Sequence, residues 1–258
     1  MQIAIVVYPG LTALDAIGPY EVLRSLPGCD LRLVWKEIGP IVTDSNLLVL
    51  GATHSLSETP RPDVVLVPGS SGRTVTTMAD REVLDWLRAC HETTRLTTSV
   101  CSGSLILAAA GLLEGRSATS HWAALPFFSA LGVKARPDDR IVRDGKVWTA
   151  AGVSAGIDLA LSIAAELADE ETARMLQLLI EYDPKPPFDS GHMSKASPAV
   201  RNRARIEMTR QSASARELAA LPVALWRRWS DVLHRKVRGR SSVPEDVPLP
   251  RPPPETAA

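Results

Sequence analysis

Short apolar runs alternate with longer helical patterns over most of the chain, and this alternation limits the fold more than any other feature. The apolar runs are Ile3–Val7, Leu31–Trp35, Val64–Val67 and Leu96–Val100. Segments with helical periodicity lie between and after them, at Asp15–Leu26, Glu82–His91 and Ser102–Leu113. Fully apolar strands separated by helices are typical of a mainly parallel sheet that is buried on both faces. We therefore predict an α/β fold in which helices sandwich this sheet.

The same pattern continues beyond residue 113. A helix is expected near Trp122–Leu131, and a helix at Gly156–Leu167 is expected to continue to Thr172–Tyr182. Between them, Asp144-Gly145 separates two short strand candidates, Ile141–Val142 and Val147–Thr149. Asp-Gly in this position is a strong hairpin signal, so we expect one antiparallel pair in the sheet.

The chain has 258 residues, enough for one substantial core with an appendage. Residues 198–258 contain twelve Lys and Arg against six Asp and Glu, whereas residues 1–197 contain seventeen against twenty-three. We expect a catalytic domain at 1–197, a basic helical extension at 198–240 and a Pro-rich disordered tail at 241–258. Apolar residues recur at helical spacing between Arg216 and Val237, which favours a helix docked on the body.

The N-terminal segment and the cysteines indicate a cytoplasmic protein. The first ten residues lack a basic flank, and their apolar run is too short for a signal peptide or a membrane span. The three cysteines, Cys29, Cys90 and Cys101, form no CxxC pair and no set with histidines. This spacing argues against a disulfide framework and a structural metal site. Free thiols in a reducing compartment are expected.

Cys101 lies at an abrupt change of periodicity, between the apolar run that ends at Val100 and the helical run that begins at Ser102. A strand, a tight turn and a helix in that order form an elbow that presents one side chain to a cleft. The helix N-terminus then favours a thiolate, so we expect a depressed pKa for a nucleophilic cysteine. The alternative is a small buried core cysteine.

Ligands of open α/β sheets bind where loops leave the carboxyl ends of the strands. The loop after the first strand supplies Asp15, and the loop after Leu96–Val100 supplies Cys101. Two further loops offer a donor-rich backbone, through Gly69 with Ser70 and through Gly152 with Val153. Asp15 could instead be the N-cap of the helix that begins there.

Several motifs resemble the ThiJ/PfpI superfamily, which has a flavodoxin-like, class I glutamine-amidotransferase-like fold. They are Tyr8-Pro9-Gly10 with Leu14-Asp15, Val65-Leu66-Val67-Pro68-Gly69, and Val100-Cys101-Ser102-Gly103-Ser104. Further motifs resemble the bacterial isocyanide hydratases within it: Ala118-Thr119-Ser120-His121-Trp122, Val142-Arg143-Asp144-Gly145, Ala150–Asp158 and Ile180–Phe188. The resemblance covers about residues 2–198.

The resemblance implies hydration of an isocyanide to an N-formamide, with Cys101 as nucleophile, Asp15 as proton donor and no metal or organic cofactor. Backbone N–H groups of Gly69, Ser70 and Ser102 would stabilise developing negative charge. The Ser102 hydroxyl and Tyr182 are candidates to hold the sulfur or Asp15. A small-molecule substrate and a homodimer are further implications.

Two other functions stay open at this stage. A glyoxalase or another thiol-dependent stress enzyme would use the same cysteine. Peptidase-like members of the superfamily carry His directly after the nucleophile, where this chain has Ser102, so proteolysis is not expected. A regulator would join this fold to a DNA-binding module, but the tail after Ser197 is short for one and shows no helix-turn-helix pattern. No nucleic acid and no membrane partner is expected. His121 could be catalytic or a packed structural residue.

Overall fold

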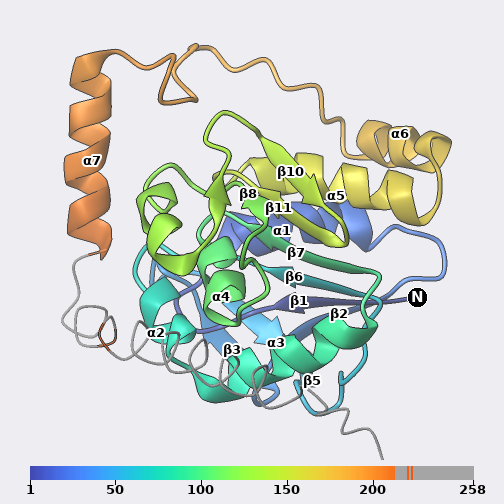
Figure 1. Ribbon diagram of the computed structural model, residues 1–258. Helices are drawn as coiled ribbons and strands as arrows, with labels where there is room; N and C mark the ends of the chain where they lie inside the picture. The colour runs from blue at the N-terminus through green and yellow to red at the C-terminus, as the bar shows by residue number, and fades with distance from the viewer. Residues whose placement is uncertain (213–219, 221, 223–258) are drawn as a thin grey trace, which may run out of the picture.

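The computed structural model of the protein describes residues 1–212, 220 and 222, and its centre is a seven-stranded sheet (Figure 1). In chain order the strands are β1 Gln2–Val6, β2 Asp30–Trp35, β5 His54–Ser55, β6 Val64–Val67, β7 Leu96–Val100, β10 Ile141–Asp144 and β11 Val147–Ala150. Their order across the sheet is β10-β11-β7-β6-β1-β2-β5. Only β10 and β11 pair antiparallel, so the predicted mainly parallel sheet with one hairpin is confirmed.

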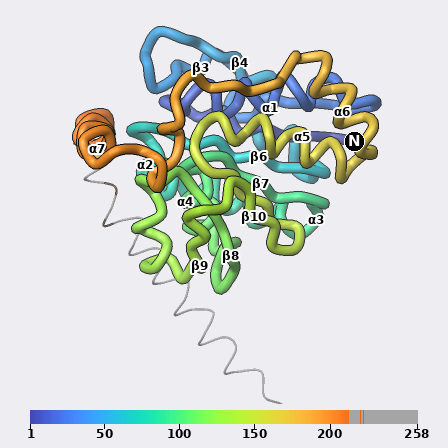
Figure 2. The backbone as a smooth tube through the Cα atoms, turned by 90° about the horizontal axis from the view of Figure 1, so that it is seen from above, coloured from blue at the N-terminus to red at the C-terminus, as the bar shows by residue number. Residues whose placement is uncertain are grey.

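Helices cover both faces of this sheet (Figure 2). One side carries α1 Ala13–Leu23, α5 Ala155–Leu167 and α6 Glu170–Leu179, and the other carries α2 Thr74–Met78, α3 Arg81–Thr93 and α4 Gly103–Ala109. The central strands require two covered faces because every side chain of β6 and β7 is buried. Because β1, β6 and β7 are parallel neighbours, their carboxyl ends lie side by side and their loops meet at one edge of the sheet.

Two of the expected helices differ in the structure. The expected helix at Trp122–Leu131 is wrong: the structure has two short 3-10 helices, η1 Leu125–Phe127 and η2 Ser129–Leu131. A proline at the start of η1 and the left-handed Gly132 after η2 limit helix length there. The expected helix at Gly156–Leu167 does not continue into the next one. Asp169 separates them and caps α6 by accepting from the Thr172 N–H.

Helix α4 is shorter than the periodicity indicated, since it ends at Ala109 and not at Leu113. Gly111 follows with φ at +85°, in the left-handed region that commonly ends helices. Several small elements had not been expected from the sequence. They are strand β5, helix α2, the antiparallel pair β3 Gly39–Val42 and β4 Val49–Ala52, and the parallel pair β8 Ser117–Ala118 and β9 Lys134–Ala135.

The body continues through an irregular segment into α7 Pro198–Ser212, which has no buried residue and stands apart from the sheet in Figure 1. Apart from residues 220 and 222, the predicted helix between Arg216 and Val237 lies outside the described residues, and so does the Pro-rich tail. The boundaries at 197 and 240 therefore stay predictions.

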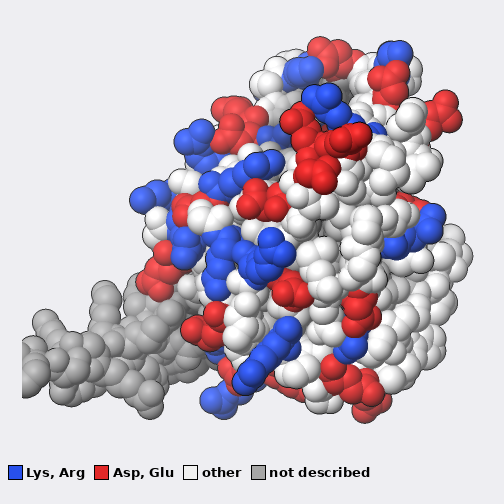
Figure 3. Space-filling model, turned by 90° about the vertical axis from the view of Figure 1, so that its right-hand side faces the viewer, with Lys and Arg blue, Asp and Glu red and all other residues white. Residues whose placement is uncertain are grey.

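Charged side chains of both signs are interspersed on the face drawn in Figure 3. Within the described part of the chain, no helix is long and apolar enough to cross a membrane.

Candidate active site

Cys101 lies at the elbow between β7 and α4 with φ at +58°. This left-handed conformation is uncommon for a residue with a side chain, and it persists only where the surroundings enforce it. The Cys101 N–H donates to the carbonyl oxygens of Ala150 and Ala151, at 3.2 and 2.9 Å. The Ser120 hydroxyl donates to the Cys101 carbonyl at 2.8 Å, and Ser104 donates to Ser120 at 2.8 Å. The strained residue is thus fixed on both sides.

Two glycines allow the elbow to pack closely against β6 and the loop after it. A Cβ at Gly103 would lie 2.1 Å from the carbonyl oxygen of Val67, which is backbone and cannot move aside. A Cβ at Gly69 would lie 2.6 Å from the backbone nitrogen of Ser102. The absence of these side chains is what brings the two loops together at the sulfur.

Asp15 is fully buried in the first turn of α1. One of its oxygens, Oδ2, accepts from the Gly69 N–H at 2.8 Å. The N-cap of α1 is Thr12, so the alternative that Asp15 caps the helix is wrong. Burial raises the pKa of Asp15 to about 7, although the Gly69 N–H and the nearby Cys101 thiol lower it. The acid can therefore hold a proton near neutral pH.

The Cys101 thiol lies beside this acid, and the two groups affect each other. Cys101 is only 6% exposed, and burial together with the negative charge of Asp15 raises the pKa of the thiol well above its usual value. Backbone N–H groups of Ser102 and Val153 act in the opposite direction. The expected depressed pKa is therefore wrong, because burial and a neighbouring carboxylate outweigh the donors at the helix start. At rest the thiol keeps its proton.

The buried oxygen Oδ1 of Asp15 has no hydrogen-bond partner among the described residues. The Cys101 thiol lies beside the carboxyl group and lowers its pKa. A buried carboxyl oxygen without a donor is costly, and it is most easily tolerated when the acid is protonated. The pair therefore presents one thiol and one acid that can exchange protons with a bound molecule.

The N–H groups of Gly69 and Ser70, which were predicted to stabilise negative charge, have other partners in the structure. The Gly69 N–H is taken by Asp15, and the Ser70 N–H donates to the Ser102 hydroxyl at 3.0 Å. The Ser102 hydroxyl also contacts Thr74 Oγ1 at 2.7 Å, so it does not hold the sulfur. Gly69 and Ser70 are therefore supports of the acid and the elbow, and the N–H groups at the sulfur belong to Ser102 and Val153.

The fourth loop supplies Val153 through a close packing of Gly152 on His121. A Cβ at Gly152 would lie 2.6 Å from the imidazole Cδ2. The ring also packs on Trp122, and burial lowers the pKa of His121. These contacts make the ring a neutral packing surface behind the loop.

Tyr182 lies elsewhere: its hydroxyl donates to Asp158 of α5 at 3.2 Å. The predicted contact of Tyr182 with the sulfur or with Asp15 is therefore wrong. Ser104 and Ser120 hold the elbow and were not predicted. Ser120 lies in the Ala118–Trp122 motif, which was the only signal in the sequence that pointed to it.

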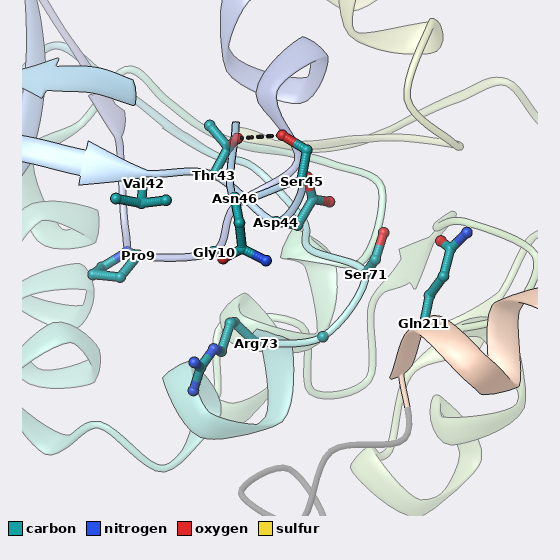
Figure 4. A pocket seen from close by; sticks show the side chains of 11 residues that line it. Pro9, Gly10, Val42, Thr43, Asp44, Ser45, Asn46, Ser71, Arg73 and Gln211 are labelled. Carbon is teal, nitrogen blue, oxygen red and sulfur yellow. Dashed lines mark hydrogen bonds between the residues drawn. The ribbon is translucent and has the colours of Figure 1, made fainter. Parts of the chain in front are cut away.

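A hollow of about 570 Å³ lies next to the site (Figure 4). It is lined by the β1–α1 loop, the β3–β4 turn, the loop before α2 and Gln211 of α7. Neither Cys101 nor Asp15 lines it. It borders the site through Gly10, whose carbonyl accepts from Ser70 Oγ at 2.5 Å, and through Asp44, whose charge raises the pKa of Asp15. Within the described ranges no three His, Cys, Asp or Glu side chains gather as a metal site.

The pattern of the DJ-1/PfpI family matches residues 1–166. The chain belongs to the DJ-1/PfpI family. It is 46% identical over 208 residues to an isonitrile hydratase from Pseudomonas putida, covering 80% of this chain and 89% of that protein. Isonitrile is another name for isocyanide.

Two further family relatives bear on fold and function. The structure is similar to that of a ThiJ/PfpI family protein from Pseudomonas syringae, with a TM-score of 0.78 and 38% identity over 86% of this chain and 90% of that one. The HTH-type transcriptional regulator CdhR of Pseudomonas aeruginosa is 31% identical over 165 residues, 61% of this chain but only 48% of the regulator. Proteins similar to this chain thus carry names that give different functions.

Proposed function

We propose that the protein is an isocyanide hydratase that converts R–NC to an N-substituted formamide. The observation that carries this proposal is the buried pair of Cys101 and Asp15, with two backbone N–H groups at the sulfur. The 46% identity with an isonitrile hydratase supports the choice of substrate class. The substrate is a small molecule that needs a nucleophile and a proton at the same carbon, and the pair offers both.

In the first step the Cys101 sulfur attacks the terminal carbon of the isocyanide. A proton from the Asp15 carboxylic acid goes to that carbon, and the thiol proton passes to the carboxylate. The product is a thioimidate, R–N=CH–S–Cys101. The raised pKa values suit this step because the proton is already present on the pair when the substrate arrives.

In the second step the Asp15 carboxylic acid gives its proton to the thioimidate nitrogen, and the resulting carboxylate accepts a proton from the water that adds to the carbon. The C–S bond then breaks, the formamide R–NH–CHO leaves, and the proton of the added hydroxyl returns to the sulfur. Over the whole cycle one water is consumed, and both the thiol and the acid are protonated again. The N–H groups of Ser102 and Val153 stabilise the sulfur as it leaves with negative charge.

The homodimer belongs to the same proposal. The β3–β4 turn exposes apolar side chains that a second copy would cover, among them Leu47 at 90% exposure.

A substrate panel tests the function: purified protein is given alkyl and aryl isocyanides beside methylglyoxal, and formamide is measured directly. Turnover of an isocyanide that is lost in the Cys101→Ala variant is expected. Turnover of methylglyoxal alone would replace the proposal with a glyoxalase. Inactivity on every compound, with salt-sensitive binding of duplex DNA, would favour a regulator.

A further inference from the structure

A surface cluster of polar groups holds the loop that carries Val153. Arg140, just before β10, donates through Nε to Asp158 Oδ2 at 2.7 Å, and its Nη2 lies 2.5 Å from the same oxygen. Nη2 also donates to the Ser154 hydroxyl at 3.4 Å. Tyr182, after α6, donates to Asp158. The cluster joins the hairpin, the start of α5 and the end of α6.

Arg140 also reaches the catalytic elbow through the main chain. Its carbonyl accepts from the Ala151 N–H at 2.9 Å, and the Ala151 carbonyl accepts from the Cys101 N–H at 2.9 Å. The loop from Ala151 to Ser154 is thus held at its first residue by the Arg140 backbone and at its last by the Arg140 side chain. Val153 lies between these two attachments.

Backbone hydrogen bonds join the loop to the first turn of α5, from the Ala155 N–H to the Gly152 carbonyl at 2.9 Å and from the Gly156 N–H to the Val153 carbonyl at 3.2 Å, but no side chain caps the helix. Ser154 is its N-cap, but the serine side chain accepts no hydrogen bond from the first turn of the helix. Its hydroxyl contacts Arg140 instead. A planar guanidinium that bridges a carboxylate and a hydroxyl fixes orientation as well as distance.

The cluster is too exposed to be explained by stability. The Arg140 side chain is 51% exposed and that of Asp158 29%, and ion pairs in such surroundings contribute little to the free energy of unfolding. Arg136 and Asp139 form another ion pair in the same loop, at 2.7 Å, without a connection to the elbow. That pair is the matched control.

We propose that Arg140, Asp158 and Tyr182 are positioning residues that keep the Val153 N–H on the sulfur of Cys101. The consequence for turnover rests on the proposed function, whereas the effect on the ionisation of the thiol does not. Two other groups face the thiol and do not depend on this cluster. Asp15 from α1 raises the thiol pKa, and the Ser102 N–H lowers it. His121 behind Gly152 is neutral through burial.

The test is the pH profile of alkylation at Cys101 in the full chain. Iodoacetamide labelling is followed at each cysteine by peptide mass spectrometry, with the half-buried Cys29 as internal reference. The variants are Arg140→Ala, Arg140→Lys, Asp158→Asn and Tyr182→Phe, with Arg136→Ala as control. In each profile, the rate at the high-pH plateau reports access to the sulfur, and the midpoint pH reports how well the thiolate is stabilised. A loosened loop that only increases access would therefore change the plateau and not the midpoint.

Loss of one hydrogen bond to a thiolate is expected to raise the midpoint by about one pH unit in Arg140→Ala. Asp158→Asn and Arg140→Lys should give smaller upward shifts, Tyr182→Phe the smallest, and Arg136→Ala none. An unchanged or lowered midpoint in Arg140→Ala and Asp158→Asn, whatever the melting temperature, overturns the proposal. If the midpoint moves but the native chain hydrates no isocyanide, the positioning role stands and the proposed function fails.

Discussion

Cys90 and Cys101 are both buried thiols, but they lie at opposite ends of their helices. Cys90 is in the last turn of α3, where its sulfur donates to the Pro60 carbonyl at 3.6 Å, and burial raises its pKa to about 12. Cys101 lies just before α4, where N–H groups point at the sulfur and Asp15 lies beside it. Burial raises the pKa of both thiols, and at Cys101 the charge of Asp15 raises it further. The difference in partners makes one a core residue and the other a candidate nucleophile.

The largest effect is expected when the sulfur of each cysteine is exchanged for oxygen. Cys101→Ser should lower formamide formation by on the order of 10⁴-fold or more, because the hydroxyl lacks both a low pKa and a base of the required strength. Cys90→Ser should leave turnover per folded molecule unchanged. Both are measured by kcat/KM beside circular dichroism. Activity retained in the Cys101 variant would move the nucleophile elsewhere.

The second test removes the acid that distinguishes the two sites. Asp15→Asn keeps an oxygen to accept from Gly69 but cannot supply a proton, so kcat should fall about 10²- to 10⁴-fold. Isocyanide turnover by the native protein should also decline as pH rises above about 7, where the acid loses its proton. A kcat that is unchanged in the variant would reduce Asp15 to a structural role.

The same residue predicts how stability depends on pH. The pKa of Asp15 is raised from 3.8 in the unfolded chain to about 7 in the folded one, so the folded state holds the proton more tightly. Its contribution is fully present below pH 3.8 and is lost as pH rises through about 7, by up to about 4 kcal/mol. Urea unfolding of the native chain and Asp15→Asn at pH 5 and pH 8 measures it. The native chain should lose stability relative to the variant at the higher pH.

The elbow can be tested through the glycine behind it. Gly103→Ala places a methyl group against the Val67 carbonyl and should destabilise the fold by about 1–3 kcal/mol or more. Gly191→Ala is the control, because no atom lies within 4 Å of its added Cβ. Thermal melting compares the two variants. Equal melting temperatures would show that the elbow does not depend on this close approach.

The smallest effect is expected at the end of the chain. Truncation after Arg240 removes the Pro-rich segment, which has almost no apolar side chains to bury, and should change the free energy of unfolding by less than about 0.5 kcal/mol. Activity and melting of the shortened chain provide the check. A clear loss of either would give this segment a role that its composition does not indicate.

The α/β class, the parallel strands and the position of the elbow could all be predicted from the sequence. These follow from local patterns: four apolar runs, an Asp-Gly turn, and a cysteine where a strand pattern meets a helical one. Such signals are short-range, because side-chain periodicity and turn chemistry depend on neighbouring residues. They also identified Asp15 as a group that would meet Cys101, since loops at the carboxyl ends of adjacent strands converge.

The groups that surround the sulfur became known only from the three-dimensional structure. The pKa of Cys101 is raised and not lowered, because the balance among burial, Asp15 and two N–H groups depends on three-dimensional packing. The Gly69 and Ser70 N–H groups have partners that are 54 and 32 residues away, and Tyr182 binds Asp158 across 24. Contacts between residues so far apart leave no local trace, so their chemistry is set when the sheet brings the loops together.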